Sequence, residues 1–115
     1  MKHQGSCHCG RIAYEVDGDI ERVIQCNCSI CSKRGYLLWF VPRQQLRLAT
    51  AESALSTYTF KSGRIQHRFC GHCGCAPFGE GADKSGAATA AINVRCLDGV
   101  DPSTLTVVPF DGRSL

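Results

Sequence analysis

The sequence predicts an all-β fold. Short apolar runs of strand length follow one another along the chain, separated by turns that contain glycine and aspartate. No amphipathic pattern long enough for a helix of more than about two turns interrupts them. Nine cysteines in 115 residues are gathered in short motifs, which is typical of a small domain held together by metal ions. We therefore expect residues 1–115 to form one zinc-binding domain of packed strands.

The first strand is expected over residues 12–16, where Ile12, Tyr14 and Val16 alternate with small or polar residues before a turn at Asp17. The wholly apolar run at 36–41 has the pattern of a fully buried strand and should lie at the centre of the core. In chain order, the other strands are expected over residues 22–25, 44–48, 55–60, 64–69, 87–94 and 105–108.

Three further segments differ in composition from the other expected strands. Residues 87–94 suit a short helix because of their alanines, but Ile92 and Val94 alternate as in a strand, and we favour the strand. The glycine-rich, charged residues 79–86 predict a mobile loop. Residues 109–115 predict a polar tail.

No export or membrane-spanning signal is visible in the sequence. Residues 1–7 lack the apolar centre of a signal peptide, and the longest apolar run, residues 36–41, is too short to cross a bilayer. We therefore expect a cytoplasmic protein with no membrane partner. Thiols stay reduced in that compartment, so the nine cysteines favour metal binding over a framework of disulfides.

The strongest metal signal is a knuckle, Cys70-x-x-Cys73 followed by Gly74. Two sulfurs on such a tight turn can accept hydrogen bonds from backbone N–H groups, and glycine accommodates a positive φ. Cys7 and Cys9 can supply the other two thiolates, because alternate residues of an extended segment face the same side. These four cysteines predict a closed structural zinc site.

A second group of thiols, Cys26, Cys28 and Cys31, lacks an obvious fourth ligand. If Cys75 or Cys96 reaches it, the site is closed and structural. If neither does, a zinc ion there keeps one open position, which acidifies a bound water or thiol and suits reactions between thiols and aldehydes. We favour the open site, with Cys26, Cys28 and Cys31 as the catalytic metal ligands.

Together the motifs resemble the glutathione-dependent formaldehyde-activating enzyme family, which also includes the centromere protein V domain. The resemblance extends over about residues 5–112. It is carried by GSCHCG at residues 5–10, CNCSIC at 26–31, FCGHCG at 69–74 and NVRCLD at 93–98.

Membership implies a β-tent of antiparallel sheets and two zinc ions per chain. One ion is implied on Cys7, Cys9, Cys70 and Cys73, and the second on Cys26, Cys28 and Cys31, where the family's chemistry takes place. That chemistry is the assembly of S-(hydroxymethyl)glutathione from formaldehyde and glutathione, classed as a carbon–sulfur lyase reaction.

We therefore expect a zinc-dependent carbon–sulfur lyase whose partners are an aldehyde and glutathione or a related small thiol. The alternative is a non-catalytic zinc module that binds another protein. Nucleic acid is not expected, because thiolates around two zinc ions would offset the formal charge of +3.

The roles of other side chains are less constrained by the sequence. Arg34 and Arg95 are the candidate contacts for substrate carboxylates, with Lys33 as a weaker one. A proton could come from His8, His72, Tyr36 or solvent. The aromatic residues Trp39, Phe40 and Phe78 are assigned to the core rather than to the substrate.

Overall fold

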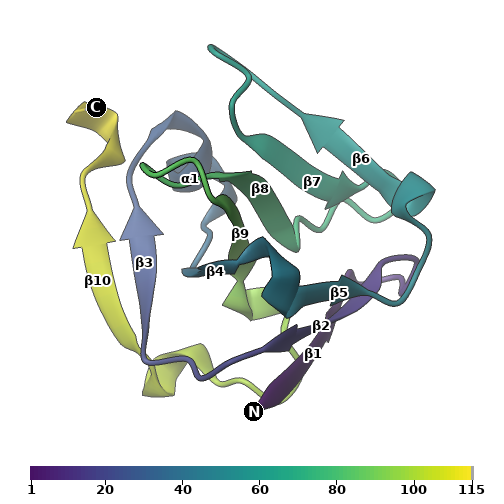
Figure 1. Ribbon diagram of the computed structural model, residues 1–115. Helices are drawn as coiled ribbons and strands as arrows, with labels where there is room; N and C mark the ends of the chain where they lie inside the picture. Colours follow the sequence, from purple (N-terminus) through teal and green to yellow (C-terminus); the bar gives the residue numbers. More distant parts are fainter. Residues whose placement is uncertain (115) are drawn as a thin grey trace.

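The computed structural model describes residues 1–114, which form ten strands arranged in two sheets, one short helix and several 3-10 turns (Figure 1). In chain order the elements are β1 Lys2–Ser6, β2 Ala13–Asp17, β3 Arg22–Cys26, α1 Ser29–Arg34, β4 Leu38–Pro42, β5 Leu46–Leu48, β6 Leu55–Tyr58, β7 Gln66–Cys70, β8 Phe78–Ala82, β9 Ala88–Asn93 and β10 Thr106–Phe110. The all-β prediction is confirmed. No helix in this part of the chain has the length and apolar content needed to span a bilayer.

The smaller sheet has the order β1-β2-β5 and the larger one the order β10-β3-β4-β9-β8-β7-β6. Neighbouring strands are antiparallel, as expected, with one exception: β10 runs parallel to β3, pairing Phe110 with Cys26. Parallel pairing requires a long connection between the two strands, and most of the chain lies between β3 and β10. The pair brings Phe110 beside a cysteine motif.

The main core lies between the two sheets. Ile12, Tyr14 and Val16 contribute from the smaller sheet and the segment before it, and Trp39 and Ile92 from the larger one. Each is at most 7% exposed, so each contributes roughly 1.5–3 kcal/mol of apolar burial. The alternation that predicted the first strand is the pattern that fills this core.

The second face of the large sheet is only partly covered by the residues that the structure describes. Along β4 the buried Trp39 and Val41 alternate with Leu38 and Phe40, and successive side chains of a strand point to opposite faces. The prediction that Trp39 belongs to the core is therefore confirmed, whereas the same prediction for Phe40 is wrong, since 53% of its surface is exposed. An apolar run predicts a strand buried on both faces, but here the second face is covered only in part, since Leu38 packs against Ile30, Cys31 and Tyr36 and Phe40 is exposed.

The predicted mobile loop at residues 79–86 is largely wrong, because β8 occupies Phe78–Ala82 between β7 and β9. Glu80 holds this glycine-rich strand in place by accepting hydrogen bonds from Arg43 Nε at 2.6 Å and Arg68 Nε at 3.0 Å. Pairing on both edges and these two ion pairs outweigh the poor strand propensity of glycine. The strand favoured over residues 87–94 is confirmed as β9.

Other differences concern the chain ends and the second cysteine motif. The polar segment Lys2–Ser6 forms β1 by pairing with β2. Strand β10 continues to Phe110, and a 3-10 turn covers Gly112–Ser114, so the predicted polar tail is structured over its described part, while Leu115 lies outside the described residues. Helix α1 was not expected, because six residues are too few for a periodic signal; it ends where Gly35 adopts φ 69°.

Candidate metal centres

The first group of thiols consists of Cys7, Cys9, Cys70 and Cys73, whose sulfur atoms all lie within 4.8 Å of one another. The Sγ atoms of Cys7 and Cys9 are 3.7 Å apart, and those of Cys9 and Cys70 are 3.6 Å apart. A tetrahedral zinc ion with Zn–S bonds of about 2.3 Å requires sulfur–sulfur edges of roughly 3.8 Å. The four side chains therefore fit a closed zinc site.

The backbone around the first group is shaped to hold thiolates. The N–H of Cys73 donates to the Sγ of Cys70 at 3.4 Å, and the N–H of Ile12 donates to the Sγ of Cys7 at 3.3 Å. Gly74 has φ +83° and donates its N–H to the carbonyl of Cys70. Backbone N–H groups, those of Cys75 and Cys9 foremost, lower the pKa of Cys73 to about 5. This geometry matches the knuckle that the sequence predicted.

The second group consists of Cys26, Cys28 and Cys31, whose sulfur atoms also lie within 4.8 Å of one another. Cys26 ends β3, Cys28 precedes α1, and Cys31 lies on the helix. The N–H of Cys28 donates to the Sγ of Cys26 at 3.4 Å. Burial raises the pKa of Cys31. Burial also acts to raise the pKa of Cys28, but hydrogen bonds from backbone N–H groups and from the neighbouring thiols outweigh it, and the pKa of Cys28 is lowered.

Residues 110–113 pack beside the second group of cysteines and hydrogen-bond to Asn27. Asn27 donates from Nδ2 to Asp111 Oδ1 at 3.0 Å and accepts at Oδ1 from the N–H of Arg113 at 2.9 Å. Its own N–H donates to the carbonyl of Phe110. A Cβ atom on Gly112 would stand 2.6 Å from the Sγ of Cys26, so only glycine allows this close approach. Sequence reasoning missed this support; the one available signal was a polar asparagine between two cysteines.

Neither Cys75 nor Cys96 joins the second group: among residues 1–114, no fourth cysteine, histidine or carboxylate has its ligand atom within the 4.8 Å limit that defines it. Cys96 lies elsewhere, with its Sγ 4.0 Å from the carbonyl of Ala76 and 3.9 Å from Asn93 Nδ2. Cys75 packs against the main core.

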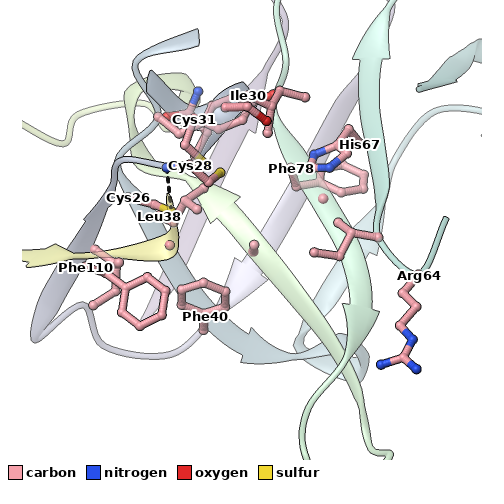
Figure 2. Close-up of a pocket in the computed structure, with 18 of the residues that line it drawn as sticks. Cys26, Cys28, Ile30, Cys31, Leu38, Phe40, Arg64, His67, Phe78 and Phe110 are labelled. Carbon is pink, nitrogen blue, oxygen red and sulfur yellow. Dashed lines mark hydrogen bonds between the residues drawn. The ribbon is translucent and has the colours of Figure 1, made fainter. Parts of the chain in front are cut away.

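A cavity of about 1040 Å³ opens beside the second group, and all three of its cysteines line it. Figure 2 shows the cysteines at one side of the cavity, above the rings of Phe40 and Phe110, with His67 and Arg64 on the other side. The lining is mainly apolar and includes Ile24, Ile30, Tyr36, Leu38, Phe40, Phe60, Ile65, Phe78, Ala91 and Phe110, together with Lys61, Arg64 and His67. The three thiols are thus placed where a small molecule could reach them.

The remaining predicted site residues are divided between the cavity and other places. Tyr36 lines the cavity, and its hydroxyl accepts a hydrogen bond of 2.6 Å from Arg34 Nη1. Burial raises the pKa of Tyr36, although Arg34 opposes this effect. Arg34 itself, Arg95, His8 and His72 are not among the described residues that line the cavity.

Arg34 is engaged with aromatic rings instead. Its guanidinium carbon lies 5.6–6.0 Å from the ring centres of Phe69, Tyr36 and Tyr58. Burial, with a contribution from Arg34, lowers the pKa of His67, which lines the cavity and stacks on Phe60. Arg34 therefore influences the cavity through Tyr36 and His67.

Comparisons with known proteins agree with this geometry. The family model described as glutathione-dependent formaldehyde-activating enzyme matches residues 2–107. A crystal structure of a Rhodobacter sphaeroides protein, a target of Northeast Structural Genomics, is similar with a TM-score of 0.80 and 32% sequence identity. The match covers 95% of this chain and 98% of that chain.

Proposed function

Because the chain belongs to the glutathione-dependent formaldehyde-activating enzyme family, we propose that it is a zinc-dependent carbon–sulfur lyase. Its substrates would be adducts of an aldehyde with glutathione or a related small thiol. The observation that carries the proposal is the position of Cys26, Cys28 and Cys31 on the wall of a cavity of about 1040 Å³. The alternative, a non-catalytic zinc module, needs no such opening.

Two zinc ions per chain would be held by the two groups of thiols. Cys7, Cys9, Cys70 and Cys73 supply the four thiolates of a structural site, and the cavity-lining trio holds the second ion. A zinc ion with an open position supplies a Lewis acid that keeps a thiol ionised at neutral pH. We also propose a cytoplasmic location, because thiols stay reduced there and can bind metal.

The reaction proposed is the reversible cleavage of a thiohemiacetal, RS–CH(OH)R′. The carbon–sulfur bond breaks, the electron pair stays on sulfur, and the hydroxyl proton leaves as the aldehyde carbonyl forms. The reverse reaction adds the thiol to the aldehyde and returns the proton to oxygen. No oxidant or reductant is required in either direction.

Tyr36 is the residue we propose to donate a proton to the substrate oxygen as the thiol adds to the aldehyde. In cleavage the same step runs backwards, and the Tyr36 phenolate accepts the hydroxyl proton. It is the only one of the three sequence candidates, Tyr36, His8 and His72, that is among the described lining residues. Because its hydroxyl oxygen accepts a hydrogen bond from Arg34, the phenol proton is free to be donated into the cavity. Its raised pKa keeps the phenol protonated at neutral pH.

The carboxylates of a glutathione-like thiol would be met by the cations that line the cavity, Lys61 and Arg64. Arg95, which is exposed on the turn after β9, and Arg34 stay predictions for this role. A substrate contact from Arg34 would require it to leave the rings of Tyr36, Tyr58 and Phe69.

The proposal is tested by measuring the exchange between S-(hydroxymethyl)glutathione and free glutathione by two-dimensional NMR, with the zinc-loaded protein. Wild type should accelerate exchange, Cys28→Ser should not, and Tyr36→Phe should be slower by roughly 10²-fold. Tyr58→Phe, on an exposed tyrosine outside the cavity lining, is the matched control. If wild type accelerates exchange with neither formaldehyde nor a larger aldehyde, the enzyme proposal fails and the interaction module is favoured.

A further inference from the structure

The cavity has an apolar wall directly beside the second group of cysteines. Building on the proposed function, we propose that the aldehyde-derived part of the substrate is bulky and apolar, an aromatic or branched alkyl group. It would lie against Phe40 and Phe110, which we call the phenylalanine wall.

The position of Phe110 relative to the thiols supports this assignment. Phe110 is the register partner of Cys26 in the parallel pair of β10 and β3. The point where a Cβ on Gly112 would stand is 2.6 Å from the Sγ of Cys26 and 3.6 Å from the Phe110 ring. The carbon that carries R′ in a thiohemiacetal is bonded to the substrate's own sulfur, which would lie beside Cys26 as the fourth ligand of the zinc ion. A substituent on that carbon is therefore within reach of the Phe110 ring.

The exposure of the phenylalanine wall indicates that a bound ligand covers it. Phe40 is 53% exposed and Phe110 is 46% exposed, although both are large apolar side chains. Ile24 and Leu38, from the neighbouring positions of β3 and β4, extend the same apolar surface to Cys26. Apolar patches gathered around a cavity mark binding sites more often than scattered exposed residues do.

The volume of the cavity supports a large substituent as well. Gly79, Ala82 and Ala91, on β8 and β9, line the cavity with almost no side-chain bulk. The resulting space of about 1040 Å³ lies at the upper end of the range for drug-sized ligands. An adduct of formaldehyde adds a single carbon to the thiol and would leave the phenylalanine wall in water.

The cations of the lining, which also contains the carboxylate of Asp83, are separated from this wall. The cations Lys61 and Arg64 belong to the connection between β6 and β7, and Figure 2 shows Arg64 across the cavity from the cysteines. A molecule that spans the cavity would thus place its anionic groups near this connection and its apolar group near the thiols. This orientation fits a charged thiol joined to an apolar aldehyde.

The test compares two stable thioethers, S-benzylglutathione and S-methylglutathione, which lack the hydroxyl group needed for cleavage. Their dissociation constants are measured by isothermal titration calorimetry with the zinc-loaded protein. We expect S-benzylglutathione to bind at least tenfold more tightly, because an apolar ring is removed from water. Phe40→Ala and Phe110→Ala should each reduce this preference severalfold, and Ala91→Leu should reduce it by filling the cavity. Val107→Ala, at an exposed apolar residue of β10 outside the lining, should leave it unchanged.

Equal affinities for the two thioethers would overturn the inference, and so would a preference that survives Phe40→Ala, Phe110→Ala and Ala91→Leu. The proposed function would then still stand if the protein accelerates exchange of S-(hydroxymethyl)glutathione. If S-benzylglutathione binds more tightly but no adduct is turned over, the proposed apolar binding at the phenylalanine wall is supported and the proposed lyase activity is overturned. Absence of binding for both thioethers would overturn the inference.

Discussion

The two groups of cysteines are built from the same ligand type and differ in where the fold places them. In the first group, Cys7 and Cys70 are 2% and 1% exposed and belong to the core between the sheets. In the second, the sulfurs line a cavity on the other face of the large sheet. The comparison indicates that surroundings, more than ligand chemistry, separate a site that holds the fold from one that can meet a substrate.

The two groups also differ in how they are supported. Backbone N–H groups of its own motifs stabilise the first, as with Cys73 donating to the sulfur of Cys70. The second also has such a bond, from the N–H of Cys28 to the sulfur of Cys26, but it depends in addition on residues far along the chain, since Asn27 binds Asp111 and the backbone of Arg113. A remote support of this kind allows the second site to be disturbed without unfolding the protein.

The largest effect is expected for Cys70→Ser. Removal of a buried thiolate from the closed group should abolish zinc binding there, and the folding free energy contributed by a structural zinc is comparable with the whole stability of a small domain. We expect no cooperative thermal transition in circular dichroism. Cys96→Ser, at a thiol outside both groups, is the control and should unfold as wild type does. A folded Cys70→Ser protein with a wild-type transition would remove the distinction between the groups.

Cys28→Ser, unlike Cys70→Ser, should leave the protein folded. We expect a folded protein that contains one zinc ion instead of two, because the second group lies outside the main core. Zinc content by mass spectrometry and the thermal transition, measured on the same sample, check this expectation. If Cys28→Ser unfolds as completely as Cys70→Ser, both groups are structural and the division is wrong.

A smaller effect is expected for Gly112→Ala. The new Cβ would stand 2.6 Å from the Sγ of Cys26 and must displace it, so zinc affinity at the second group should fall roughly ten- to hundredfold, as for other changes to the supports of metal ligands. Competition with a chelator measures this loss. Gly81→Ala, where a Cβ meets its neighbours at 3.6 Å or more, is the matched control. Unchanged affinity in Gly112→Ala would argue that the end of the chain does not shape the site.

The smallest effect is expected for Asn27→Ala. The hydrogen bonds to Asp111 and Arg113 are exposed, and their loss should cost about 1 kcal/mol. We expect zinc affinity at the second group to fall only severalfold, with the first group unaffected. Chelator competition on both sites measures the difference. A loss at the first site as large as at the second would contradict the local role of Asn27.

Much of the fold could be predicted because short sequence patterns specify its strands and its cysteine knuckle. The alternation of Ile12, Tyr14 and Val16, and the spacing of the knuckle at Cys70, each depend on a few neighbouring residues. Strand β8 was missed because pairing on both edges and the ion pairs of Glu80 are long-range effects that override glycine propensity. Burial on one face only, as in β4, is equally invisible in an apolar run.

The candidate site was predictable only in part for the same reason. The membership of Cys26, Cys28 and Cys31 in one cluster follows from their spacing, and the structure brings their sulfurs together. The cavity depends on β10 returning parallel to β3, which no local pattern specifies. Phe110 and Gly112 could therefore not be assigned to the site from sequence.

The most direct test of an open second site is a titration of the cobalt-substituted protein with glutathione, followed by absorption spectroscopy. Cobalt replaces zinc in tetrahedral sites and reports each thiolate ligand through charge-transfer absorption. We predict that glutathione increases this absorption in wild type and leaves it unchanged in Cys28→Ser, because the added thiol binds only at the group beside the cavity. An unchanged spectrum in wild type, with two cobalt ions bound, would show that the second site is closed and contradict the account.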